Sequence, residues 1–107
     1  MVNAKLELQS ELDGKSTIKC AKIVMGDFWG EEEDDDRIKY KLTINHTAAE
    51  LESFYKSLDF QYNNGYGGQE LFGTIWLEDG TWLSRGEYDG SEWWEHNVLP
   101  QIPSDLL

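Results

Sequence analysis

Two Asp-Gly pairs, Asp79-Gly80 and Asp89-Gly90, constrain the fold of this chain more than any other feature. An Asp-Gly pair favours the positive φ angles of a two-residue hairpin turn, because glycine adopts them without steric cost. The runs LFGTIWLE and TWLSRGEY flank the first pair, as the two strands of a hairpin would. We therefore expect strands over residues 71–78 and 81–88, joined by a tight turn.

The length of this turn decides which side chains face the core. Pairing Glu78 with Thr81 places one set on the more apolar side: Leu71, Ile75, Leu77, Trp82 and Tyr88. The opposite side then carries Phe72, Trp76, Leu83, Arg85 and Glu87. Because side chains alternate along a strand, a register shifted by one residue would exchange the two sides.

The second Asp-Gly pair predicts a further strand over residues 91–97. In this register Trp93 lies over Gly86 and fills the gap that the glycine leaves. Trp94 lies beside Arg85, at the distance of a cation–π contact. We expect Trp94, on the less apolar side, to be the better anchor for a partner.

Two features leave this last strand open to a second interpretation. Glu87 would face Glu92 directly, and like charges opposed across strands are unfavourable. Ser91 also suits the N-cap of a short helical turn that ends before Pro100. The tryptophans are then either core and sheet-edge cover or part of an interface.

The amino-terminal third predicts a second hairpin. One side of residues 5–12 is apolar, with Leu6, Leu8 and Leu12 spaced by multiples of two. A third Asp-Gly pair, residues 13–14, supplies the turn signal, and the β-branched run over residues 16–25 the return strand. The alternation slips between Cys20 and Ile23, which indicates a bulge or a sheet edge.

A strand and a helix follow. Residues 37–44 alternate, with Ile38, Tyr40, Leu42 and Ile44 on the inward side. Lys39 and Lys41, with Lys19 or Lys22 of the neighbouring strand, would form a basic stripe on the outward side.

Residues 47–58 predict a helix, because Thr47 and Glu50 fit a capping box. Its apolar stripe consists of Leu51, Phe54, Tyr55 and Leu58. The sequence as a whole predicts a single α+β domain over residues 1–107. We expect an antiparallel sheet of five or six strands with one helix on one side.

Charge narrows the classes of partner. The chain has 21 acids and 9 bases, a net charge of −12, and Arg85 is the one base after residue 56. Such a chain repels nucleic acid and anionic lipid and favours a basic protein surface. No apolar run approaches the roughly 20 residues of a membrane span. The lone Cys20 fits a reducing, cytoplasmic environment.

The residues do not favour an enzyme. Glu87 and Glu92 among aromatic rings resemble a glycosidase pair, but a chain of 107 residues with acids at its turns offers little room for a cleft. His46 and His96 lack the spacing of metal ligands, so we expect neither a metal nor a cofactor.

The carboxyl-terminal third, with its motif RGEYDGSEWW and closing PQIP, resembles the endings of small uncharacterised bacteriophage and prophage proteins. The resemblance implies, by analogy between classes, an inhibitor of host defence. Such proteins occupy the nucleic-acid-binding surface of a CRISPR or restriction effector, in some cases as nucleic-acid mimics.

We therefore expect a non-enzymatic, cytoplasmic inhibitor that binds a basic host protein. The expected steering residues are Glu31, Glu32, Glu33, Asp34, Asp35 and Asp36, and the expected ordered contacts are Glu87, Asp89, Glu92, Trp93, Trp94 and Glu95. One alternative is an accessory phage protein that forms a homodimer through a sheet edge. A further alternative is a small carbohydrate-binding module that uses the tryptophans.

Overall fold

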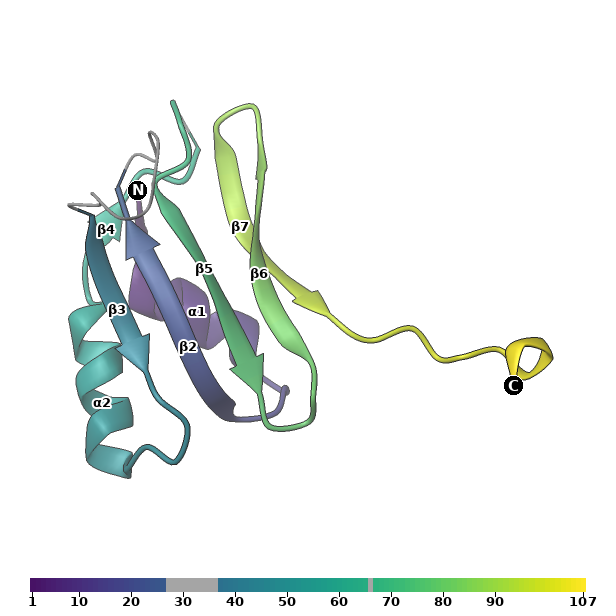
Figure 1. The fold of residues 1–107 in the computed structure, drawn as a ribbon. Helices are drawn as coiled ribbons and strands as arrows, with labels where there is room; N and C mark the ends of the chain where they lie inside the picture. Colours follow the sequence, from purple (N-terminus) through teal and green to yellow (C-terminus); the bar gives the residue numbers. More distant parts are fainter. Residues whose placement is uncertain (27–36, 66) are drawn as a thin grey trace.

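The computed structural model describes residues 1–26, 37–65 and 67–107 (Figure 1). The expected steering residues Glu31 to Asp36 lie outside the described residues. The larger sheet is antiparallel, has five strands and follows the order β3-β2-β5-β6-β7. Its strands are β2 (Ile18–Met25), β3 (Ile38–Leu42), β5 (Leu71–Leu77), β6 (Trp82–Tyr88) and β7 (Ser91–Asn97).

The helices are α1 (Ala4–Leu12), α2 (Ala48–Ser57) and a short 3-10 helix, η2 (Ser104–Leu106). A small sheet pairs β1 (Val2–Asn3) with β4 (Gln61–Tyr62) and lies beside α1. The expected α+β fold is confirmed, with two α-helices where the sequence predicted one. No helix in the described ranges is long and apolar enough to cross a bilayer.

One hydrophobic core lies between the five-stranded sheet and the two α-helices (Figure 1). Leu8 of α1 and Phe54 of α2 pack in the same cluster as Ile23, Ile75 and Leu83 from the three central strands. The helices therefore cover one side of the sheet. The opposite side has no helix on it in the described part of the chain.

The predicted strand over residues 5–12 is wrong, because these residues form α1. Ala4, Leu8 and Leu12 are also spaced by four, so the same leucines fit a helix, and Ala4 and Leu8 are buried. Leu6, the residue that the strand pattern requires to be inward, is 58% exposed. Asn3 caps the helix by accepting a hydrogen bond from Leu6 N, at 3.1 Å.

The third Asp-Gly pair ends this helix and does not form a hairpin. Gly14 has a φ of 77°, the left-handed conformation common just after a helix. The return strand is confirmed as β2, and its irregularity lies between Ile18 and Cys20, opposite β5.

The strand β3 and the helix α2 confirm their predictions in type. In α2 the capping box is complete, because Glu50 N donates to Thr47 Oγ1 and Thr47 N donates to Glu50 Oε1. Leu42 is buried, but Ile38 is 59% exposed because β3 is an edge strand. Ile44, also predicted inward, lies beyond the end of β3 and is 55% exposed.

The hairpin of β5 and β6 is confirmed, but its predicted register is wrong by one residue. Trp76 pairs with Trp82 and Ile75 with Leu83, where the two-residue turn required Leu77 opposite Trp82. Leu77 N donates to Thr81 O, so the loop has three residues and closes through Gly80 at a φ of 87°.

The longer loop exchanges the two sides of β6, as a one-residue shift must. Leu83 is fully buried and the side chain of Arg85 is 2% exposed, although both were expected on the outer side. Tyr88, expected in the core, is 77% exposed.

The hairpin of β6 and β7 forms in the predicted register. Gly86 pairs with Trp93 and Arg85 with Trp94. The turn residues Asp89 and Gly90 both have positive φ, at 51° and 88°, as a type I′ turn requires. Residues 91–97 are strand, so the alternative helical turn is wrong.

Candidate protein-binding face

A buried charged cluster lies where α1, β4, β6 and β7 meet. Arg85 Nη2 donates to Glu92 Oε1 at 2.6 Å and to the hydroxyl of Tyr62 at 2.8 Å. Arg85 Nη1 lies 3.3 Å from Glu7 Oε1, and the same Glu7 oxygen accepts the Tyr62 hydroxyl. The guanidinium carbon also lies 4.8 Å from the centre of the Trp94 ring. The cluster therefore compensates a cation that has almost no contact with solvent.

Glu92 completes this cluster and fastens the loop before β5. Its carboxylate accepts the backbone N–H groups of Glu70 and Leu71, at 2.8 and 3.0 Å. The ion pair with Arg85 compensates the buried charge of Glu92, although Glu87 lies directly opposite on the same side of the sheet, where its own side chain is exposed.

Burial raises the pKa of Tyr62 well above its ordinary value of 10, and the hydrogen bond to Glu7 raises it further. Tyr62 therefore stays protonated and donates to the carboxylate while it accepts from Arg85. This arrangement holds charges in place inside the fold. It offers no open position for a substrate.

The faces of the two adjacent tryptophans are opposite to those predicted. Trp94 is 5% exposed and belongs to the core, whereas Trp93 is 38% exposed on the other side of the sheet. The predicted neighbours are nevertheless correct, because a Cβ built on Gly86 would lie 2.5 Å from Trp93 Nε1. Neither Trp94 nor Glu92 lies on a surface that a partner can reach.

The side of the sheet opposite the helices, which we call the open face, carries three accessible tryptophans. Trp76 is 45% exposed, Trp93 is 38% exposed, and Trp82 is half-buried. Trp76 and Trp82 are paired across β5 and β6, so their rings occupy neighbouring positions on this face. Trp93 Nε1 donates to Glu95 Oε1 at 3.0 Å, which orients its ring beside a carboxylate.

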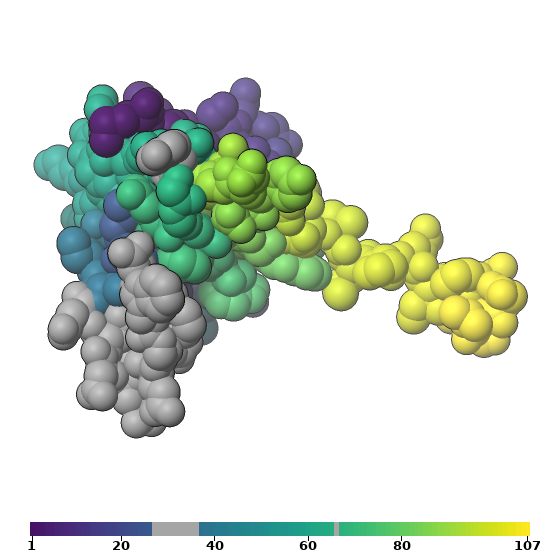
Figure 2. Space-filling view, turned by 90° about the horizontal axis from the view of Figure 1, so that it is seen from above, coloured from purple at the N-terminus to yellow at the C-terminus, as the bar shows by residue number. Residues whose placement is uncertain are grey.

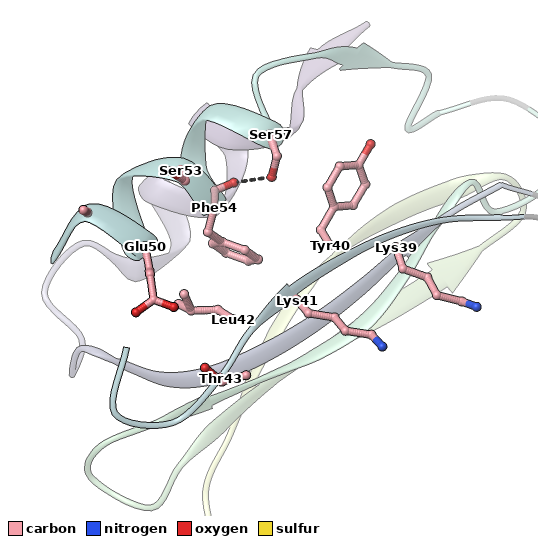
Figure 3. A pocket seen from close by; sticks show the side chains of 10 residues that line it. Lys39, Tyr40, Lys41, Leu42, Thr43, Glu50, Ser53, Phe54 and Ser57 are labelled. Atoms are coloured by element: carbon pink, nitrogen blue, oxygen red, sulfur yellow. Dashed lines mark hydrogen bonds between the residues drawn. The ribbon is translucent and has the colours of Figure 1, made fainter. Parts of the chain in front are cut away.

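Charge is divided across the open face. At its β2–β3 end lie Lys22, Lys39 and Lys41, with Lys22 and Lys41 paired across the strands. Figure 3 shows Lys39 and Lys41 pointing away from α2, on the side opposite Tyr40. The predicted basic stripe is therefore present.

The exposed acids lie at the β5–β7 end, around the tryptophans. Glu78 and Asp79 lie at the β5–β6 turn and Glu95 lies on β7, opposite Ser84, while Glu87 and Asp89 lie at the tip of the β6–β7 hairpin, with Glu87 on the side of β6 that carries Arg85. Hydrogen bonds from the Thr81 hydroxyl and backbone N–H hold the pKa of Asp79 below its ordinary value. Glu87 accepts the Gly90 N–H within its own turn.

The predicted ordered acids therefore do not form one row. Glu87 and Asp89 sit at the tip of the hairpin, Glu95 lies on the open face, and Glu92 is buried. The open face carries Trp93 and Glu95 and also Trp76 and Trp82, two residues that were not among the expected contacts; Trp93 lies opposite Gly86, four residues along β6 from Trp82. Had the β5–β6 loop been taken as three residues long, the register would have placed Trp76 and Trp82 on the open face.

A hollow lies on the helical side of the sheet, between α2 and the edge strand β3 (Figure 3). It has a volume of about 580 Å³ and is lined in part by Tyr40, Glu50, Ser53, Phe54 and Ser57. The Ser57 hydroxyl donates to Phe54 O within the helix, at 2.6 Å. These side chains show no arrangement of nucleophile and base.

Among the described residues, no group of three or more His, Cys, Asp or Glu side chains is placed to hold a metal ion. No protein-family model, curated protein or solved structure matches this chain.

Proposed function

We propose that this protein is a non-enzymatic binding protein whose open face docks on another protein. The observation that carries the proposal is the set of three tryptophans on the side of the sheet opposite the helices, two of them 45% and 38% exposed. Tryptophan is enriched at interface hot spots, because one rigid ring buries a large area at low entropic cost.

The strands that present these rings are rigid, which favours tight docking. Gly86 packs under Trp93, and the buried Arg85–Glu92 pair fastens β6 to β7 directly beneath the face. Little ordering entropy is then lost on contact. The acids around the tryptophans, within a net charge of −12, favour a partner with a basic rim.

Inhibition of a nucleic-acid-binding effector of host defence is the specific role that we propose within this class. It is supported by the net charge and by the phage-like carboxyl-terminal motif. The division of charge on the open face favours docking through aromatic contacts over mimicry of a nucleic acid, because lysines occupy its other end.

The test is affinity capture from a bacterial lysate with matched variants, with the retained proteins identified by mass spectrometry. We expect a protein that the wild type retains to be lost with Trp76→Ala. Leu6→Ala is the control, because Leu6 is 58% exposed on α1, on the side of the sheet that the helices cover. Thermal melts of both variants establish that they are folded.

Equal retention by the wild type and a folded Trp76→Ala variant would show that the open face is not the interface. Turnover of a nucleic acid or a glycan that copurifies with the chain, and is lost in Glu87→Gln, would show instead that the protein is an enzyme.

A further inference from the structure

The last ten residues, 98–107, which we call the tail, extend away from the rest of the molecule (Figures 1 and 2). Five of its apolar side chains are between 60% and 89% exposed: Val98, Leu99, Ile102, Leu106 and Leu107. Its backbone hydrogen bonds join Leu106 to Pro103 and Leu107 to Ser104, all within the tail. So much exposed apolar surface in an acidic chain indicates a segment that is buried in another contact.

The tail begins beside the tryptophans of the open face. Asn97, the last residue of β7, pairs with Trp82, which pairs in turn with Trp76. One molecule therefore carries an apolar segment and an uncovered aromatic surface at the same end of its sheet. Each would remove apolar surface from water by packing against the other.

Two prolines favour an extended conformation of the tail where it leaves β7. A residue that precedes proline is restricted to extended conformations, which applies to Leu99 before Pro100 and to Ile102 before Pro103. A return onto the molecule's own face requires a reversal of direction at this point, immediately after β7. An extended, proline-containing segment is also the form that aromatic-lined surfaces bind at low entropic cost.

We propose that the tail of a second copy of this chain lies across the open face, and that two copies exchange tails reciprocally. The inference rests on the proposed use of the open face for protein binding. Reciprocal exchange closes a two-fold dimer, so it buries both apolar features without forming a filament.

The charges of the two surfaces are complementary. Asp105 is the one charged side chain in the tail. The row of Lys41, Lys22 and Thr74 runs directly beside the row that contains Trp76, so a tail that crosses the sheet brings its carboxylate toward two lysines.

A consequence for function follows from shared use of the face. Self-association and binding of a different protein compete for the same tryptophans. The dimer is then unable to bind the partner, and dissociation of the tail exposes the open face.

Sedimentation velocity over a range of protein concentrations tests the exchange on the full chain. We expect the wild type to be a concentration-dependent dimer. The double variant Leu99→Asp/Ile102→Asp should raise the dissociation constant at least about tenfold, because it places two charges in an apolar contact. Ile44→Asp is the control, since Ile44 is 55% exposed but lies between β3 and α2, and it should remain dimeric.

A synthetic peptide of residues 98–107 then identifies the surface that the tail contacts. Added to the double variant, it should change the tryptophan fluorescence and saturate, because the peptide contains no tryptophan of its own. The response should be lost when Trp76→Ala is added to the double variant.

Three results would overturn the inference: a monomeric wild type, a double variant as dimeric as the wild type, or a peptide that binds equally without Trp76. Affinity capture with the double variant distinguishes two failures: a tail that does not exchange between copies, and an open face that does not bind a partner. A partner that the variant still retains through Trp76 supports the proposed function even where the tail does not exchange.

Discussion

Arg85 and Glu92 show how one pair of side chains decides the orientation of a whole hairpin. Their side chains are 2% and 0% exposed, and they turn Trp94 inward and leave Trp93 outside. A buried cation and anion are each costly alone, so the pair constrains β6 and β7 to the one register in which both are satisfied.

Arg85→Met should therefore lower the free energy of unfolding by about 3–5 kcal/mol, because it leaves Glu92 buried without its cation. Urea denaturation measures the change. Lys5→Met is the matched control, since the ion pair of Lys5 with Asp59 is 3.7 Å long and partly exposed, and should cost less than about 1 kcal/mol. Similar losses in the two variants would contradict the role assigned to the cluster.

Tyr62 predicts a dependence of stability on alkaline pH. Its pKa is raised in the folded chain, chiefly by burial, so the unfolded chain releases the phenolic proton at lower pH than the folded chain does. The contribution of Tyr62 to stability is then fully present below about pH 10 and is lost as the pH rises further.

Urea midpoints between neutral pH and pH 11 should show this fall, and Tyr62→Phe should reduce its slope. Tyr40 and Tyr55, whose pKa values burial also raises, account for the slope that remains. A Tyr62→Phe variant with the slope of the wild type would refute the assignment. Tyr88→Phe, at an exposed position, is the control.

At the scale of elements, the close contact of β2 with β5 depends on Gly73. Its φ is 148°, and a Cβ there would lie 2.4 Å from Lys22 O and 2.8 Å from Ile23 Cα. Both neighbours are backbone atoms of β2, so they cannot move aside without separating the strands.

Gly73→Ala should cost more than about 3 kcal/mol, because backbone strain adds to a steric clash. Gly80→Ala should cost about 1–2 kcal/mol, because Gly80 also has positive φ but has open space around it. Thermal melts measure the loss of stability in each variant. Gly73→Ala combines a steric clash with backbone strain, whereas Gly80→Ala has the backbone strain alone. Equal losses at the two positions would mean that β2 yields at Gly73.

The elements also show what the sequence could predict. Local signals were sufficient for the capping box of α2 and for the type I′ turn at Asp89-Gly90, because each depends on a few adjacent residues. The strand assigned to residues 5–12 was wrong because Leu8 and Leu12 fit a helical spacing as well as a strand spacing, and the contact of Leu8 with the core decides between them.

The candidate site was harder to predict, because it depends on the loop length and on contacts between residues far apart in the sequence. An Asp-Gly pair suits a loop of two or of three residues, and one residue exchanges the faces of Trp82, Leu83 and Arg85. The partners of Arg85 come from positions 7, 62 and 92, and no local pattern relates them. The predicted neighbours of Trp93 and Trp94 were correct, and the face on which each lies was not.

The whole molecule combines a net charge of −12 with exposed tryptophans on one side of its sheet. We expect these to act on different steps of binding. Long-range attraction raises the association rate with a basic protein, and added salt screens it as the Debye length falls to about 8 Å at physiological ionic strength. Contacts of the tryptophans determine the dissociation rate.

Surface plasmon resonance with the captured partner, at increasing salt concentration, should show slower association and a nearly constant dissociation rate. Trp76→Ala should show the opposite pattern, with faster dissociation and little change in association. A dissociation rate that rises steeply with salt would indicate that ion pairs, and not the tryptophans, hold the complex.

The central claim is that the open face contacts the partner while the side toward the helices does not. The indole N–H signals in a two-dimensional proton–nitrogen NMR spectrum report on each tryptophan separately. On addition of the captured partner, we predict that the signals of Trp76, Trp82 and Trp93 shift and that of the buried Trp94 does not. Unchanged signals from Trp76, Trp82 and Trp93 in a saturated complex would contradict the claim.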